Sequence, residues 1–164
     1  MKQITIILGS DHGGFALKEQ LRLFLQNENA IDGISIEKLV DVGTYGEQPC
    51  DYPDFVKKAA KAYKSIAYKL CGLWKTKSKD DKVFVILTCG SGAGVSMAAN
   101  RYKFFRALLC LNPQQAGLSR EHNKSNCLCF GQKFISFEEA KLATINFLTT
   151  TFEAGRHVKR INKF

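Results

Sequence analysis

Residues 83–88 form an uninterrupted, largely apolar segment that leads directly into a glycine-rich turn, and no other feature restricts the fold as much. Six residues are the length of a strand, and a strand that is apolar on both sides is typical of a parallel sheet covered by helices on both faces. The turn, residues 89–94, reads Cys-Gly-Ser-Gly-Ala-Gly, and the small residues at 95–100 predict a helix after it. This strand–turn–helix unit indicates an α/β domain.

The same alternation continues along the chain. Strands are also predicted at residues 4–8, 36–42, 107–111 and 127–130, and helices at 15–25, 55–63, 113–120 and 138–148. In the first helix, the apolar spacing places Lys18, Glu19 and Arg22 on the outer face. We therefore expect one domain over residues 1–164 with a three-layer Rossmann-like fold. Its five-stranded parallel sheet has the order 2-1-3-4-5, helices flank both faces, and a basic C-terminal helical tail follows at 155–164.

Composition excludes several classes of protein. The 164 residues are 45% hydrophobic, which indicates a compact domain rather than a disordered chain. Every apolar segment is too short to span a membrane, and the first one ends at Gly9, before it reaches the length of a signal-peptide core. The six cysteines include no Cys-x-x-C pair and favour neither a disulfide framework nor a zinc site. We expect a cytoplasmic protein without a membrane role, with most thiols buried.

The formal net charge of +9 leaves three kinds of partner open, namely nucleic acid, an acidic protein or a phosphorylated small molecule. The lysines are scattered, no aromatic-basic motif for RNA is present, and the charged connection at 71–82 is expected to be solvated. The tail is more specific, because Arg156 and Arg160 lie one helical turn apart, a spacing that suits a phosphate group.

Two turns carry the residues most suited to chemistry, at 9–14 and 89–94. Both follow predicted strands, and ligands of α/β sheets bind at the carboxyl ends of strands where the strand order reverses, so one pocket can hold both. The amides of 89–94 can cradle an anion, although Val95 breaks the Gly-x-Gly-x-x-Gly pattern. Cys89 is then either a thiolate base facing these amides or a small buried residue. His12 and His122 lie in polar contexts that favour function, although a single histidine is more often structural.

Together these motifs resemble the ribose-5-phosphate isomerase B family, which includes the galactose-6-phosphate isomerase subunits. The resemblance extends over nearly the whole chain, with the motifs in the family's order. The matching segments are Gly9-Ser10-Asp11-His12-Gly13-Gly14, Asp51-Tyr52-Pro53, Cys89-Gly90-Ser91-Gly92-Ala93-Gly94, Ala98-Ala99-Asn100, Ser119-Arg120-Glu121-His122-Asn123 and Gly155-Arg156-His157-x-x-Arg160.

The resemblance implies interconversion of D-ribose 5-phosphate and D-ribulose 5-phosphate through an enediolate, without a metal or an organic cofactor. By analogy, Cys89 is the base that moves the proton between C2 and C1, and His122 opens the sugar ring with the assistance of Ser91. The enediolate oxygens would be held by the backbone amides of Gly90, Gly92, Ala93 and Gly94.

The remaining implied contacts bind the substrate. Asp11 and Asn123 would hold sugar hydroxyls, and His12, Arg156 and Arg160 would meet the phosphate. Lys133 stands where the family often has an arginine, so it keeps the charge and loses the bidentate geometry. The resemblance also implies a homo-oligomer, a dimer or a tetramer, with sites shared between subunits. It leaves open whether His122, Asn123 and the tail arginines serve their own pocket or the neighbour's.

Several alternatives remain at this stage. Some family members use a glutamate as the base at the position of Val95, which leaves Cys89 as the candidate here. Within the same class, the substrate could be galactose 6-phosphate or allose 6-phosphate. From other classes, the charge allows a basic nucleic-acid-binding module, and a catalytically inactive sugar-phosphate sensor is a further reading. We favour the ribose enzyme, with no nucleic acid and no membrane among its partners.

Overall fold

The computed structural model describes residues 1–28, 30–71 and 82–163. The charged connection predicted at 71–82 therefore lies, apart from its two end residues, outside the described residues. None of the described helices combines the length and the apolar character that crossing a membrane requires. The five cysteines whose side chains the structure describes are all free thiols, and four of them are buried, as the sequence predicted.

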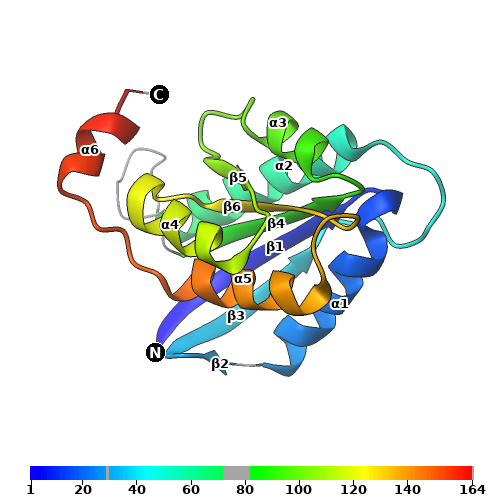
Figure 1. Cartoon of the computed structure of the whole chain (residues 1–164), viewed down its shortest axis with the longest axis horizontal. Helices are drawn as coiled ribbons and strands as arrows, with labels where there is room; N and C mark the ends of the chain where they lie inside the picture. The colour runs from blue at the N-terminus through cyan, green and yellow to red at the C-terminus, as the bar shows by residue number, and fades with distance from the viewer. Residues whose placement is uncertain (29, 72–81, 164) are drawn as a thin grey trace.

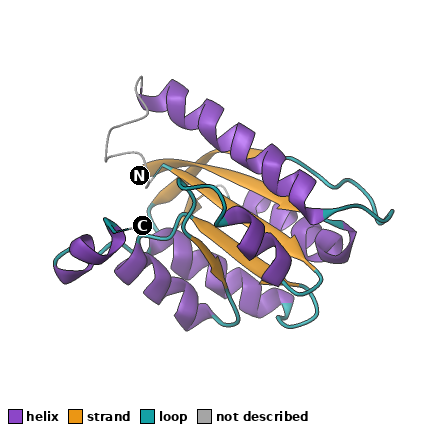
Figure 2. Cartoon of the chain, turned by 90° about the horizontal axis from the view of Figure 1, so that it is seen from above, coloured by secondary structure: helices purple, strands orange, loops and turns teal. Residues whose placement is uncertain are grey.

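The predicted three-layer α/β architecture is confirmed (Figures 1 and 2). One sheet contains β1 (Lys2–Ser10), β2 (Ala30–Ile31), β3 (Ile34–Asp41), β4 (Val83–Cys89), β5 (Ala107–Leu109) and β6 (Cys127–Gly131), in the order β2-β3-β1-β4-β6-β5. All strands run parallel except β2, which pairs antiparallel with β3. The two residues between β2 and β3, Asp32 and Gly33, both have positive φ, which is the conformation of a tight hairpin turn.

The helices cover both faces of the sheet with two apolar layers. The helical elements are η1 (His12–Gly14), α1 (Phe15–Asn27), α2 (Tyr52–Cys71), α3 (Ala93–Ala99), α4 (Pro113–Asn123), α5 (Phe137–Thr149) and α6 (Arg156–Ile161). Helices α1, α4 and α5 contribute to the core on one face, and α2 and α3 to the core on the other. All seven residues of β4 are buried between these layers, which explains its unbroken apolar sequence.

The predicted strand order 2-1-3-4-5 is wrong in its last two places. In the same numbering the observed order is 2-1-3-5-4, because β6 lies between β4 and β5. All five residues of β6 are buried, so this strand needs neighbours on both sides, whereas the three residues of β5 are half-buried. A short strand is the better edge, since it leaves few unpaired backbone groups exposed.

The parallel strands separate two edges of the domain. The turns after β1, β4 and β6 leave their carboxyl ends on one side, and the end of α4, which leads into β6, lies on the other. Figure 1 shows α6 on the same side of the domain as the N-terminus and far from the turns that begin α1 and α3. Within one chain, the residues that follow the parallel strands and the residues that precede them therefore lie at opposite edges of the domain.

Candidate active site in two halves

Cys89 ends β4 at the carboxyl edge and is 4% exposed. The backbone N–H of Gly92 donates to its Sγ atom over 3.0 Å, so the turn presents a hydrogen-bond donor to the sulfur. Gly92 has φ +75°, and a Cβ there would lie 2.6 Å from Leu109 and 2.7 Å from the backbone nitrogen of Gly131. A residue with a side chain fits neither this space nor this φ, so a glycine is required for the turn to reach Cys89.

The turn after β1 packs directly against the turn that carries Cys89. A Cβ on Gly13 would lie 3.1 Å from the nitrogen of Gly90, and one on Gly14 would lie 2.4 Å from the carbonyl carbon of Thr88. The Thr88 hydroxyl also donates to the carbonyl of Gly14 over 2.7 Å. The prediction that the two turns share one location is therefore confirmed.

Asp11 stands at the junction of these turns. Its side chain is 8% exposed and accepts a hydrogen bond from the backbone nitrogen of Gly14 at 3.0 Å. Burial is the largest influence on this carboxyl and raises its pKa, while the Gly14 hydrogen bond and the nearby His12 oppose the shift. The residue predicted to hold a sugar hydroxyl is thus in contact with the turn next to Cys89.

Three further predicted residues surround the same turns. The Nδ1 atom of His12 lies 3.1 Å from both the backbone nitrogen and the carbonyl oxygen of Cys50. Ser91 is exposed, and its hydroxyl accepts from the backbone nitrogen of Ala93 at 3.3 Å. The exposed side chain of Lys133 passes over Gly90, with Cε 3.8 Å from the position of a Cβ there. Gly94 lies against the ring of Tyr52, where a Cβ would lie 2.7 Å from the ring.

A buried lysine anchors the loop that carries Cys50, although the sequence predicted this lysine on the surface. Lys18 was expected on the outer face of α1, but it is fully buried. Its Nζ atom lies 2.5 Å from the carboxylate of Asp41 and 2.7 Å from that of Glu19. Asp41 in turn accepts from the backbone nitrogen of Gly43 at 2.8 Å, and the hydroxyl of Tyr45 donates to its carbonyl. The sequence feature that could have indicated this ion pair is Asp41, an acidic residue near the end of the strand predicted at 36–42.

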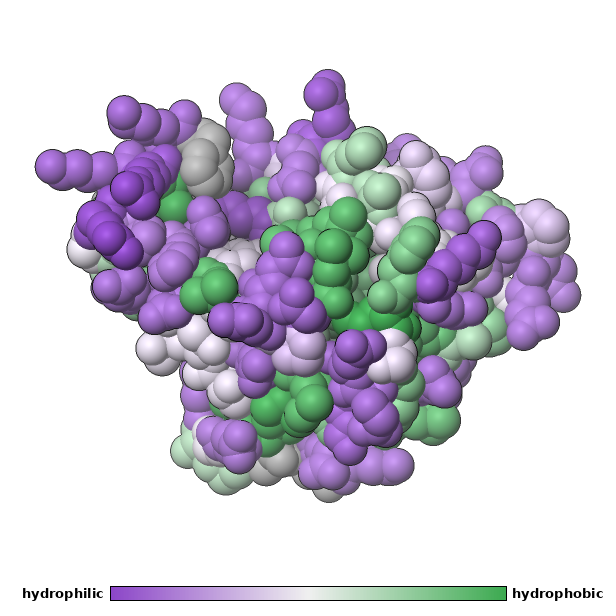
Figure 3. Space-filling view, in the orientation of Figure 1, coloured by the Kyte–Doolittle hydropathy of each residue, from purple (hydrophilic) through white to green (hydrophobic). Residues whose placement is uncertain are grey.

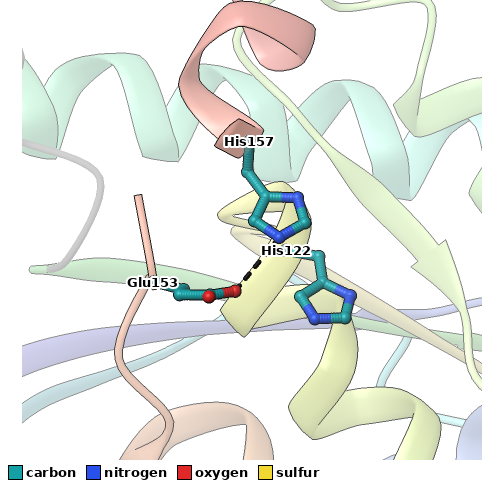
Figure 4. A group of neighbouring side chains, drawn as sticks. All are labelled: His122, Glu153 and His157. Carbon is teal, nitrogen blue, oxygen red and sulfur yellow. Dashed lines mark hydrogen bonds and ion pairs between the residues drawn. The ribbon is translucent and has the colours of Figure 1, made fainter. Parts of the chain in front are cut away.

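The remaining predicted residues form a second group at the opposite edge of the sheet. Figure 4 shows one of them, His122, beside His157 and Glu153. His122, near the end of α4, stacks on His157 of α6 with ring centroids 4.5 Å apart. His157 is 4% exposed, and its Nε2 atom lies 3.1 Å from a carboxylate oxygen of Glu153. Arg156 and Arg160 extend from the same short helix and are exposed. The tail and His122 therefore come together, although the sequence indicated no contact between them.

Asn123 ends α4 beside this group and is exposed. It lines a cavity of about 440 Å³ at the β5 edge of the sheet together with Asn100, Lys103 and Arg106. The backbone of Glu153 donates to the carbonyl of Glu121, which ties the segment before α6 to the end of α4. Asn123, His122 and the tail arginines thus share one edge of the domain.

The two groups are not brought together within one chain. Cys89 is the last of the seven residues of β4, and the residues that follow α4 enter the sheet at the other end of the neighbouring β6. At about 3.3 Å per residue, the length of β4 alone separates the two edges by about 20 Å. The predicted site residues of one chain therefore form two groups at opposite edges of the sheet.

Comparisons with known proteins identify the family of this chain. The family model described as Ribose/Galactose Isomerase matches residues 6–164. Ribose-5-phosphate isomerase B of Escherichia coli is 32% identical over 161 residues, which cover 98% of this chain and 93% of that protein. A probable ribose-5-phosphate isomerase B of Mycoplasma genitalium is 35% identical over 160 residues, covering 97% and 92%.

Solved structures show the same similarity. A ribose 5-phosphate isomerase of Thermotoga maritima has a TM-score of 0.80 and 39% identity, covering 98% of this chain and 96% of that one. Ribose-5-phosphate isomerase B of Mycoplasma genitalium, solved with bound ribulose-5-phosphate, has a TM-score of 0.81 and 33% identity, covering 99% and 95%. With a family model that matches almost its entire length and relatives above 30% identity, this chain belongs to the ribose/galactose isomerase family.

Proposed function

We propose that this chain interconverts D-ribose 5-phosphate and D-ribulose 5-phosphate by moving a proton between C2 and C1. The observation that carries the proposal is the hydrogen bond from the Gly92 amide to the sulfur of Cys89, in a turn that packs against the turn containing Asp11. The relative of known structure with bound ribulose-5-phosphate supports this choice of substrate. Because phosphorylated sugars are held inside cells, we place the enzyme in the cytoplasm.

In this mechanism the Cys89 thiolate removes the proton from C2 of the opened sugar and returns it to C1. The Gly92 amide holds the Cys89 sulfur in place over 3.0 Å, at the carboxyl end of β4 where the proposed base must stand. The amides of the same turn would stabilise the negative charge that develops on the enediolate oxygens. Val95 is buried in the core beneath the turn, so the position that carries a glutamate in some family members offers no base here.

We further propose that the enzyme is a homo-oligomer in which each active site combines two half-sites. A proton donor must come within about 3 Å of the atom it serves. His122 lies at the other edge of the sheet and cannot serve the Cys89 of its own chain. In the proposed dimer, His122, Asn123, Arg156 and Arg160 of one subunit complete the site of the other. A tetramer would contain two such dimers.

Exposed apolar side chains support an interface between copies. Met97 on α3 is 70% exposed, Leu111 is 51% exposed and Leu118 on α4 is 41% exposed. Figure 3 shows that apolar surface gathers in the middle of the face seen in Figure 1, with polar residues around it. Apolar surface with a polar surround is typical of a protein–protein contact.

The activity is tested with purified protein in the presence of a chelator. We expect interconversion of ribose 5-phosphate and ribulose 5-phosphate, and we expect Cys89→Ala to abolish proton exchange at C2. A Cys89→Ala variant that keeps near-full turnover would show that another group is the base. A clear preference for galactose 6-phosphate or allose 6-phosphate would show that the proposed substrate is wrong, while the proposed mechanism would stand. Steep, salt-dependent binding to duplex DNA without isomerase activity would favour the nucleic-acid alternative.

The shared site is tested by mixing two inactive variants, Cys89→Ala and His122→Asn. After the subunits exchange at equal amounts, half of the dimers are mixed and each has one intact site, so activity recovers to about one quarter of the wild-type value. No recovery, with exchange verified, would place His122 in its own subunit's site or outside it. Arg156→Ala should raise KM strongly with a smaller change in kcat, because phosphate binding is lost. An unchanged KM would remove the tail from the site.

A further inference from the structure

A cluster of three potential metal ligands lies at the edge of the domain that carries the tail. One ligand atom each from His122, Glu153 and His157 lies within 4.8 Å of the others. Figure 4 shows these three side chains gathered between α4, α6 and the segment before α6. In the part of the chain that the structure describes, no other group of this kind occurs. Two imidazole nitrogens and one carboxylate are the ligand set of a divalent transition metal such as Zn²⁺.

The buried member of the cluster is already oriented to bind a cation. The Nε2 atom of His157 lies 3.1 Å from the Glu153 carboxylate and 3.3 Å from Nε of Arg156. Nε2 faces a donor, Nε of Arg156, and an acceptor, the Glu153 carboxylate, so its role in these contacts depends on the tautomer. The tautomer with a lone pair on Nε2 is the one that binds metals. In that tautomer the Nε2 lone pair and the Glu153 carboxylate, 3.1 Å apart, offer two ligand atoms to one cation.

The distances allow coordination after a small movement. Bonds of 2.0–2.2 Å in a tetrahedral zinc site place the ligand atoms about 3.4 Å apart, so the pair at 3.1 Å is close to its final spacing. The two imidazole rings are stacked with their planes 12° apart, and one ring must turn before both nitrogens can meet one ion. His122 is the ring that can turn, because its side chain is 36% exposed, whereas that of His157 is 5% exposed.

We propose that His122, Glu153 and His157 form a binding site for Zn²⁺ or a similar divalent transition metal, with the fourth position open to solvent. The proposed isomerase reaction requires no metal, so this ion would act as an inhibitor. An ion held by His122 takes away the lone pair and the proton that ring opening uses. The inhibitory effect rests on the proposed function of His122, whereas the metal binding itself does not.

Binding is tested with Co²⁺ on metal-free protein, because its visible spectrum reports both geometry and ligand type. We expect about one Co²⁺ per chain, with the absorption of a site built from nitrogen and oxygen and without a thiolate charge-transfer band. Loss of an outer contact of a metal ligand weakens binding 10–100-fold, so Glu153→Gln, which removes a ligand, should weaken it at least tenfold. No binding by the wild type at millimolar Co²⁺, or a thiolate band, would overturn the proposal.

Glu121→Gln is the matched control. This residue carries the same charge, and its carboxylate lies 3.9 Å from Nε2 of His122, but it is not one of the three ligands. We expect its Co²⁺ affinity to stay within about twofold of the wild type, because a nearby exposed charge contributes little. Equal losses in Glu121→Gln and Glu153→Gln would mean that charge near the histidines, rather than a defined site, attracts the ion.

The effect on activity is a separate measurement. Zn²⁺ should inhibit the wild-type isomerase reversibly, with recovery after chelation, and the inhibition constant should rise at least tenfold in Glu153→Gln while its metal-free activity stays the same. Equal inhibition of both proteins would place the inhibitory ion elsewhere, for example on the Cys89 sulfur. Co²⁺ binding without any isomerase activity would refute the proposed function and leave the metal site intact. Isomerase activity without Co²⁺ binding would refute the metal site and leave the proposed function intact.

Discussion

Replacing Lys18 with methionine tests how the loop at 43–50 is held next to the Cys89 turn. The substitution keeps the length and the apolar part of the side chain and removes the ammonium group that contacts Asp41 and Glu19. Removing one partner of a buried ion pair costs 3–5 kcal/mol, because the other charge is left without compensation. Asp41 and Glu19 keep 17% and 28% of their side-chain surface exposed, so water offsets part of this loss. We expect a destabilisation of about 3 kcal/mol, the low end of that range.

Urea unfolding followed by circular dichroism measures the effect. With a slope of about 2 kcal/mol per molar urea, the unfolding midpoint should fall by about 1.5 M. Activity should change through substrate binding, because this loop carries the Cys50 backbone that contacts His12. We therefore expect KM to rise several-fold and kcat to change less, since His12 is expected to meet the phosphate.

Two variants control this prediction. Lys58→Met makes the same chemical change at an exposed lysine that lies 4.6 Å from the ring centre of Phe55, and it should alter stability by less than about 0.5 kcal/mol. In Lys18→Met/Asp41→Asn the unpaired carboxylate is removed as well, so part of the lost stability should return. The reasoning is refuted if Lys18→Met behaves like Lys58→Met, or if the double variant is less stable by the sum of the single losses.

Three further predictions concern stability. Gly14→Ala should cost more than about 2 kcal/mol in thermal or urea unfolding, because its Cβ meets the backbone at Thr88, whereas Gly117→Ala, in the helix α4 with its nearest atom at 3.5 Å, should be neutral or stabilising. Ser136→Ala removes the capping box of α5 and should cost about 1 kcal/mol in the same assay. The Ser136 hydrogen bonds lower the pKa of Glu139, so its contribution to stability is present above pH 4.5 and is lost as the pH falls through its lowered pKa. Glu139→Gln should therefore reduce stability at neutral pH and not in strong acid, and a constant difference across this range would contradict the assignment.

The element types and most of their positions could be predicted from the sequence, because they depend on local patterns. The apolar segment in β4 and the spacing of apolar residues in α5 report burial directly. Gly92 has a positive φ and Gly94 lies close to Tyr52, and these glycines indicated the candidate site without any knowledge of the sheet. The family resemblance followed from the same local segments.

The strand order, the burial of Lys18 and the division of the site into two edges were decided only by the tertiary structure. Whether β6 or β5 lies beside β4 depends on pairing between segments far apart in sequence, and local periodicity carries no information about such neighbours. Lys18 has the spacing of a surface residue in helix α1, and its burial depends on Asp41, which lies at the end of strand β3. Cys89 and His122 are proposed to serve one reaction, but the parallel sheet holds them at opposite edges, because the strands run their full length between these two residues.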